Sequence, residues 1–173
     1  MEKILEKLEK WRKERGLDRT QGFEFDLNTQ MSFFFEEIGV EFLRAKTEEE
    51  KIDAYCDTII FAINGSSLLG YIPIWLENAN MSFKSILLKA YLMLDSETAT
   101  EFDYSLIFTI CKDNIIELGY DFNMCMDETL KEIESRTGAI NSETGKWEKF
   151  KTDEAKAKWY KADFKKCKLK DNK

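Results

Sequence analysis

The chain contains no histidine. This absence excludes Ser-His-Asp triads, Cys-His pairs and His-ligated zinc or di-iron centres, because each needs an imidazole. Cysteine is also sparse: the four residues Cys56, Cys111, Cys125 and Cys167 form no CxxC pair and are too few for a disulfide scaffold in a chain of 173 residues. We therefore expect reduced thiols, a cytoplasmic location and, in an enzyme, catalysis by carboxylates or a cofactor.

A long uninterrupted apolar run is missing as well. The N-terminal segment alternates charged with apolar residues and lacks the apolar core of a signal peptide. The longest uncharged stretch, Thr58–Leu76, is broken by polar residues, glycines and the only proline, Pro73. We therefore expect no association with a membrane.

Net charge is negative but unevenly distributed. The chain carries a formal charge of -7, although residues 146–173 hold 11 lysines against 5 acids. An acidic body repels a phosphate backbone, so we expect no binding to nucleic acid. A basic tail beside a carboxylate-rich body suits a phosphate that is held through a metal ion.

Low proline and glycine content, with no clear period-two alternation, predicts an all-α fold. We expect one domain over residues 1–173, a bundle of about five to six helices. The expected helices cover Met1–Arg15, a segment capped near residues 26–29 and ending at about Lys46, a segment from the Thr47 capping box to about Gly70, and Phe83–Leu94, Glu101–Leu118 and Phe122–Arg136. A hairpin or ordered loop is expected over residues 139–150, then a short helix from Thr152 and a lysine-rich tail that is mobile over about residues 169–173.

Two successive helices carry acids on one face each. On the first, the shared face holds Gln30, Phe33 or Phe34, Glu37 and Glu41; on the second, it holds Glu50, Asp53, Asp57 and Asn64. The short connection makes the helices antiparallel, so the acidic faces can meet. Clustered carboxylates repel one another unless protons or cations neutralise them, and oxygen ligands without histidine favour Mg²⁺, with Mn²⁺ possible.

The apolar surroundings of these acids argue against an ordinary solvated face. Asp57 is followed at once by an apolar run, and Glu41 lies among Ile38, Val40, Phe42 and Leu43, which we expect to be core positions. The position four residues after Asp53 is another acid rather than the lysine or arginine that an exposed helix face favours.

The same segments carry a family resemblance. Glu36–Leu43 (EEIGVEFL) with Asp53–Phe61 (DAYCDTIIF) resembles the paired motifs of the MazG-like all-α nucleoside triphosphate pyrophosphohydrolases, especially the branch related to phosphoribosyl-ATP pyrophosphohydrolase. Glu132–Gly138 (EIESRTG), followed by Gly145–Trp147 (GKW), is similar to the later part of that branch. The resemblance covers roughly residues 25–165, with an insertion at about 71–104. Glu41 follows Glu37 by four residues, whereas the family's EExxE motif has a spacing of three.

The resemblance implies Mg²⁺-dependent hydrolysis of a nucleoside triphosphate between the α and β phosphates. The metal ligands are expected to be Glu37, Glu41, Asp53 and Asp57, with Glu50 as an alternative, and the proton acceptor Glu36 or Glu37. The substrate-binding candidates are Asn64, Arg136, Lys146, Tyr160 and Lys161. A homodimer or homotetramer is expected, because family members commonly associate.

Non-catalytic and purely structural interpretations of the same residues stay open. The same helices could form a non-catalytic dimer or interaction protein with a degenerate metal cluster, for which the shifted spacing of Glu37 and Glu41 is the best evidence. Asn64 could be a helix-end amide, and the lysines from Lys146 onward a solubilising tail. Phe33, Phe34 and Trp11 could stack on a base or belong to the core.

Overall fold

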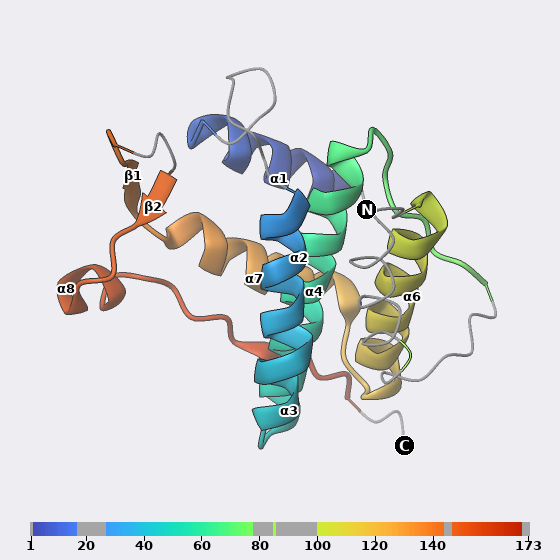
Figure 1. The fold of residues 1–173 in the computed structure, drawn as a ribbon. Coiled ribbons are helices and arrows are strands. Elements are labelled where there is room, and N and C mark those ends of the chain that lie inside the picture. The colour runs from blue at the N-terminus through green and yellow to red at the C-terminus, as the bar shows by residue number, and fades with distance from the viewer. Residues whose placement is uncertain (1, 17–26, 78–84, 86–99, 144–146, 171–173) are drawn as a thin grey trace. The chain divides into compact units, whose positions relative to one another are not determined.

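The computed structural model describes residues 2–16, 27–77, 85, 100–143 and 147–170 (Figure 1). Most of them are helical, which confirms the all-α fold. The α-helices are α1 (Glu2–Glu14), α2 (Leu27–Glu36), α3 (Phe42–Arg44), α4 (Glu48–Leu68), α6 (Glu101–Glu117), α7 (Phe122–Ser135) and α8 (Asp153–Lys156). A π-helical turn, Glu37–Glu41, joins α2 to α3, and Phe164–Cys167 forms a 3₁₀ turn. None of the described helices is both long enough and apolar enough to cross a membrane.

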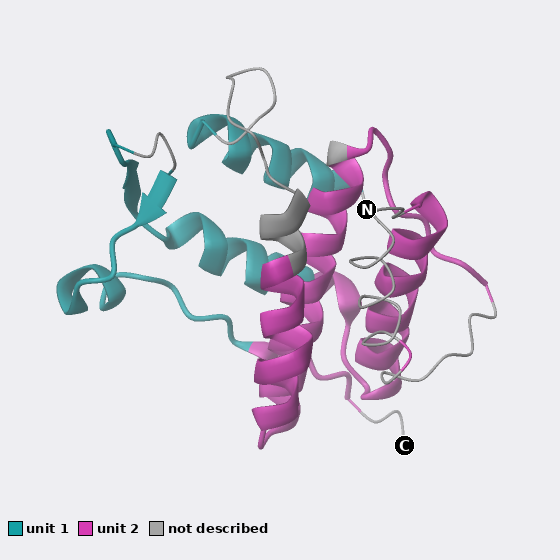
Figure 2. Ribbon diagram, viewed as in Figure 1, with its two compact units in different colours: residues 1–25, 126–163 teal, residues 26–125, 164–173 magenta. Residues whose placement is uncertain are grey.

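The chain divides into two compact units (Figure 2). Unit 1 comprises residues 1–25 and 126–163, and unit 2 comprises residues 26–125 and 164–173. The acidic helices lie in unit 2. In the sequence, residues 126–163 of unit 1 separate the two parts of unit 2.

Local sequence signals set most helix boundaries. Thr47 caps α4 in a capping box: its hydroxyl accepts from the Glu50 N–H, and the Glu50 carboxylate accepts from the Thr47 N–H, as expected. Helix α6 ends at Glu117, two residues before Gly119, whose φ of 79° lies in the region that favours glycine. Three predicted segments cannot be compared with the structure, because they lie largely or wholly outside the described residues. They are the helix expected over Phe83–Leu94, most of the expected insertion, and residues 171–173 at the end of the predicted mobile tail.

Helix α4 is the centre of unit 2. It packs against α2 on one side and α6 on another, as Figure 1 shows. Its contacts with α6 are antiparallel, since Tyr55 donates a hydrogen bond of 3.1 Å to Asn114, while Gly65, further along α4, lies against Tyr104, earlier on α6. Between Ile52 and Ser66 most side chains of α4 are buried, which makes the helix the core of this unit.

The segment after α4 lies along α6. Ser105 and Thr109, both buried on α6, accept hydrogen bonds from the backbone N–H groups of Ile74 and Leu76. The Trp75 indole donates to Asp113, one more turn along the same helix. Polar side chains spaced by four residues on α6 thus accept hydrogen bonds from backbone N–H groups of an irregular segment. These N–H groups have no hydrogen-bond partner in a helix or sheet.

Residues 164–169, near the C-terminus, pack against the rest of unit 2 and form what we call the C-terminal clamp. Phe164 and Cys167 are buried, and the Leu169 N–H donates to the Gly119 carbonyl. The Lys168 ammonium lies 2.6 Å from the Glu48 carboxylate and also covers the Tyr120 ring. The sequence signalled only a basic tail here, so this C-terminal clamp is a finding of the structure.

Unit 1 is organised around α1 and α7, which run parallel. Lys7 of α1 pairs with Asp127 at the start of α7, and the Trp11 indole donates to the Ile133 carbonyl near its end. The expected hairpin is confirmed: β1 (Gly138–Ile140) and β2 (Trp147–Lys149) pair antiparallel. Trp147 meets Trp11 edge to face, and the Arg15 guanidinium lies over both rings.

Replacing Gly65 tests the contact of α4 with α6. In Gly65→Ala the new Cβ would lie 2.7 Å from the buried Tyr104 ring, so we expect a loss of about 1–3 kcal/mol in the free energy of unfolding. Urea denaturation measures this loss. The control Ser67→Ala, half-buried on the same helix, should change it by less than about 0.5 kcal/mol. Equal stability of Gly65→Ala and wild type would contradict the close approach of the helices.

Candidate functional site

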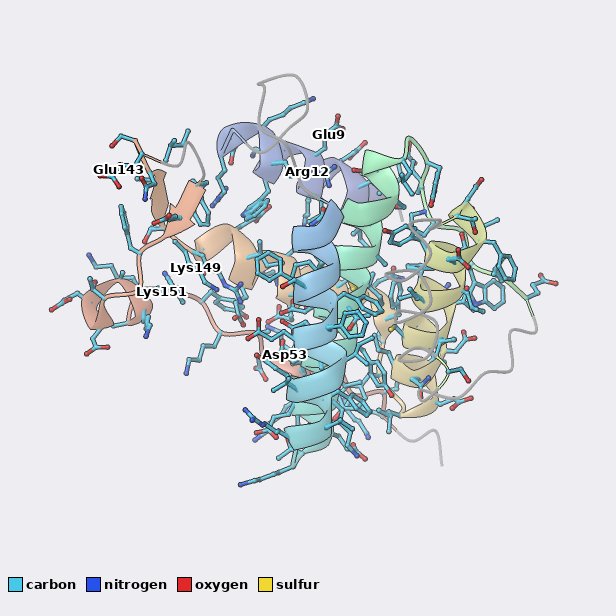
Figure 3. The ribbon with its side chains drawn as sticks, viewed as in Figure 1. Glu9, Arg12, Asp53, Glu143, Lys149 and Lys151 are labelled. Atoms are coloured by element: carbon cyan, nitrogen blue, oxygen red, sulfur yellow. The ribbon has the colours of Figure 1, made fainter. Side chains whose placement is uncertain are left out.

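One line of α4 is left open by the packing of unit 2. In the described stretch 52–66, Asp53, Asp57 and Phe61 are the only residues that are not fully buried. They are spaced by four residues, so they follow one another along one side of the helix. We call these three side chains the open line; Figure 3 labels Asp53, which stands at its start.

Aromatic contacts fix how the open line faces α2. Phe33 of α2 stacks on Phe61, with ring centroids 5.2 Å apart, and Phe42 meets Tyr55 at 4.9 Å. Residue numbers rise along one helix while they fall along the other, so the pair is antiparallel, as predicted. The two contacts bracket Glu37 and Glu41 on one helix and Asp57 on the other. Counting forward from Phe33 in steps of four residues gives Glu37 and then Glu41. Counting backward from Phe61 in the same steps gives Asp57 and then Asp53.

We call Glu37, Glu41, Asp53 and Asp57 the acid cluster, in which the other three acids act electrostatically on Glu37. Partial burial, together with the nearby charges of Asp57, Glu41, Asp53 and Glu36 in that order, raises the pKa of Glu37 to about 9. Burial removes water that would stabilise the carboxylate anion, and each neighbouring anion makes ionisation harder. In the absence of a metal ion Glu37 therefore keeps its proton at neutral pH.

The π-helical turn covers Glu37–Glu41, the two acids that α2 and its continuation supply. A π turn closes its hydrogen bond over five residues rather than four, so it absorbs one residue more than an α turn. In an α-helix a step of four residues overshoots one full turn by about 40°. In the wider turn a step of four residues falls short of a full turn instead, so Glu37 and Glu41 still lie near one another on the helix surface, Glu37 half-buried and Glu41 exposed. Such turns occur frequently at functional sites.

The acid cluster is a neighbourhood of carboxylates and not a closed ligand set. Across the described ranges, no three or more Cys, Asp or Glu side chains are arranged so that they could hold a metal ion. Glu50, the alternative ligand, uses its carboxylate to accept backbone N–H groups at the start of α4, and these bonds hold its pKa below the usual value. Glu36 is exposed beside Glu37.

Two apolar neighbours of Glu41 are not the core residues that the sequence analysis predicts. Val40 and Leu43 are exposed, Leu43 by 65%, whereas Ile38 is buried. The expectation for Val40 and Leu43 was wrong because the π turn and the short α3 present one narrow face to α4. Val40 and Leu43 lie on the outer side of this last turn, where their side chains are exposed.

The predicted substrate residues fall in both units. Asn64 is buried on α4, three residues beyond Phe61. In unit 1, Arg136 pairs with Glu132 at 2.9 Å, the Tyr160 hydroxyl donates to the buried Glu128, and Lys161 is exposed. These bonds give Arg136 and Tyr160 structural roles within unit 1. Lys146 lies outside the described residues.

Phe61 is the residue of this region that sequence reasoning missed as a candidate. It looks like part of an apolar run, yet it is the third member of the open line. Its four-residue spacing from Asp57 and the antiparallel pairing with Phe33 are signals that could have found it. Comparisons with protein-family models, curated proteins and solved structures find no match to this chain.

The raised pKa of Glu37 predicts a pH dependence of stability. Glu37 is ionised in the unfolded chain above its ordinary pKa near 4.5, but in the folded chain only above about 9, so the folded state binds more protons between these values. The free energy of unfolding therefore falls as pH rises through this window, by at most about 1.4 kcal/mol per pH unit. In metal-free buffer, urea denaturation of Glu37→Gln at pH 6, 7.5 and 9 should show a flatter profile and higher stability at pH 9. The exposed-site control Glu117→Gln on α6 should keep the wild-type slope, and an unchanged slope in Glu37→Gln would refute the burial of the Glu37 carboxyl.

The π turn predicts an unusual tolerance to deletion. Removing Val40 lets the turn revert to an α turn without rotating the flanking helices, so we expect the free energy of unfolding to stay within about 1 kcal/mol of wild type. Removing Ser32 from the regular part of α2 rotates the rest of the helix by about 100° and should cost several kcal/mol. Urea denaturation compares the two. Equal losses would show that the turn does not absorb an extra residue.

Proposed function

We propose that this protein hydrolyses a nucleoside triphosphate between the α and β phosphates, with Mg²⁺ as cofactor, to give a nucleoside monophosphate and pyrophosphate. The observation that supports this function best is the meeting of Glu37, Glu41, Asp53 and Asp57 across two antiparallel helices of unit 2. Stability alone disfavours three half-buried acids, Glu37, Asp53 and Asp57, beside the exposed Glu41, so a ligand that compensates their charge would explain them.

The donor chemistry of the acid cluster fits Mg²⁺, with Mn²⁺ as a possible substitute. Carboxylate oxygens are hard ligands, and the absence of histidine disfavours zinc and iron. We expect Glu37, Glu41, Asp53 and Asp57 to hold the ion, with Glu50 as the alternative. Rotations about the flexible χ angles of these side chains would bring the oxygens together. When bound, Mg²⁺ neutralises phosphate charge and makes a water molecule more acidic.

A carboxylate of this chain would take the proton of the attacking water. The water oxygen forms the new bond to phosphorus, the bond to the bridging oxygen breaks, and pyrophosphate leaves. Glu37 or the adjacent Glu36 would accept the proton. Burial and neighbouring acids raise the pKa of Glu37 in the metal-free chain, and the positive charge of bound Mg²⁺ would lower it again, which would leave an ionised carboxylate able to take the proton.

The π turn supports the resemblance to the MazG-like pyrophosphohydrolases. The family motif places its acids three residues apart, whereas Glu37 and Glu41 are four apart. A turn that absorbs one additional residue, located at these two acids, would account for the difference. The shifted spacing therefore no longer favours a degenerate cluster.

The phosphate and base contacts stay predictions. Arg136, Lys146, Tyr160 and Lys161 are proposed to hold the phosphates, and Asn64 to recognise the sugar or base. The four cysteines are buried and form no disulfide within the described residues, which suits the reducing cytoplasm in which we place the protein. We also infer a homodimer or homotetramer.

A second candidate is a non-catalytic interaction protein, and exposed apolar side chains favour it. Ile72, Ile74 and Trp75 are each about half exposed on the segment along α6. Isolated exposed apolar residues are common, but three close together in sequence favour a contact surface. Light scattering of the purified chain measures its association, and nucleotide turnover separates this candidate from the enzyme.

Product analysis tests the proposed reaction. Wild-type protein with Mg²⁺ and a panel of ribo- and deoxynucleoside triphosphates should release pyrophosphate and monophosphate, followed by phosphorus NMR. Asp57→Asn should lower kcat by at least about a hundredfold, because it removes a charged ligand. The matched control Glu117→Gln, at an exposed acid of α6, should keep wild-type activity. Release of orthophosphate would indicate another reaction, and no turnover of any nucleotide would favour the interaction protein.

A further inference from the structure

Phe33 is a large aromatic side chain that the fold leaves partly open. It is 42% exposed, whereas the adjacent Phe34 is 2% exposed in the core of unit 2. Phe33 stacks on Phe61 with an angle of 29° between the ring planes. One side of the Phe33 ring is thus supported by protein, while a large part of its surface faces outward. We call Phe33 and Phe61 the aromatic pair.

The aromatic pair lies next to the acid cluster along both helices. Phe33 precedes Glu37 by four residues on α2, and Phe61 follows Asp57 by four residues on α4. Both steps correspond to about one helical turn, or about 6 Å along the helices. The pair therefore continues the acid cluster in one direction, and Phe61 belongs to the same open line as Asp53 and Asp57.

Along this line the chemistry changes from hard oxygen ligands to a flat apolar face. A nucleoside triphosphate changes in the same sense, from charged phosphates through the sugar to an aromatic base. Every nucleobase has a π face that stacks on an aromatic side chain, independently of its hydrogen-bonding edge. An inorganic triphosphate or an aliphatic phosphate ester has no group that would use this surface.

We propose that the aromatic pair is the platform on which the base of the substrate stacks, with Phe33 as the contacting residue. This inference rests on the proposed function and deepens it: the substrate class is a triphosphate that carries a nucleobase. Phe61 acts as a positioning residue, because it holds the Phe33 ring and does not itself contact the base. Stacking tolerates different bases, so the pair selects nucleotides as a class.

Calorimetric titration in Mg²⁺ buffer tests the platform separately from catalysis. The probes are the α,β-methylene analogue of ATP, which resists cleavage at this bond, and inorganic triphosphate, which lacks a base. We expect wild type to bind the nucleotide analogue at least about tenfold more tightly than inorganic triphosphate. Phe33→Ala should lose most of this preference, whereas Phe33→Trp, with a larger face, should keep it.

Two further variants keep the test decisive. Phe33→Leu retains an apolar contact with Phe61 but lacks a flat face, so it should lose the preference even if Phe33→Ala fails to fold. Phe102→Ala removes another exposed phenylalanine, at the start of α6, and should bind both probes as wild type does. Thermal melting reports whether each variant is folded.

The outcomes separate the two proposals. Retention of the preference by folded Phe33→Ala or Phe33→Leu would overturn the platform. Equal affinity of wild type for both probes would also overturn it, but would leave a triphosphate site at the acid cluster standing. If wild type binds neither probe in the presence of Mg²⁺, the proposed function fails and the platform fails with it.

Discussion

The central position of α4 is the constraint on which unit 2 depends. This helix is antiparallel to both α2 and α6 and packs against both of them. Nearly all its side chains between Ile52 and Ser66 are buried. A helix surrounded in this way can present few groups to solvent. The fold leaves it one narrow line, so the residues on that line are held by a rigid backbone rather than by a loop. Precise placement of a few side chains is what such a scaffold offers.

The acids on this line oppose the stability of the helix pair that carries them. Neighbouring carboxylates repel, and partial burial strengthens the repulsion because less water screens it. Glu37 relieves part of this cost by keeping its proton. Apolar contacts on both sides of the acids, from Phe33 with Phe61 and from Phe42 with Tyr55, hold the helices together against the repulsion. Local destabilisation of this kind is typical of sites that are shaped for a ligand.

Sequence reasoning predicted the elements that depend on local chemistry. The capping box at Thr47, the end of α6 just before Gly119 and the hairpin after α7 follow from neighbouring residues, and all three are present. The antiparallel acidic helices also followed from periodicity and a short connection. The π turn could not be predicted, because its sequence reads as an ordinary helical one and carries no local signal for the wider turn. The clamp of residues 164–169 and the role of Phe61 depend on contacts between distant segments, which a local pattern does not contain.

The C-terminal clamp gives unit 2 a particular order of assembly. Residues 26–125 are made early, but Phe164, Cys167 and Lys168 complete their surroundings only after the whole segment 126–163 has been synthesised. During translation, at roughly 5–20 residues per second, the helices of unit 2 therefore wait for several seconds with the site of the clamp uncovered. Unit 2 can reach its final form only once the ribosome has passed residue 169, whereas its first helices can form long before.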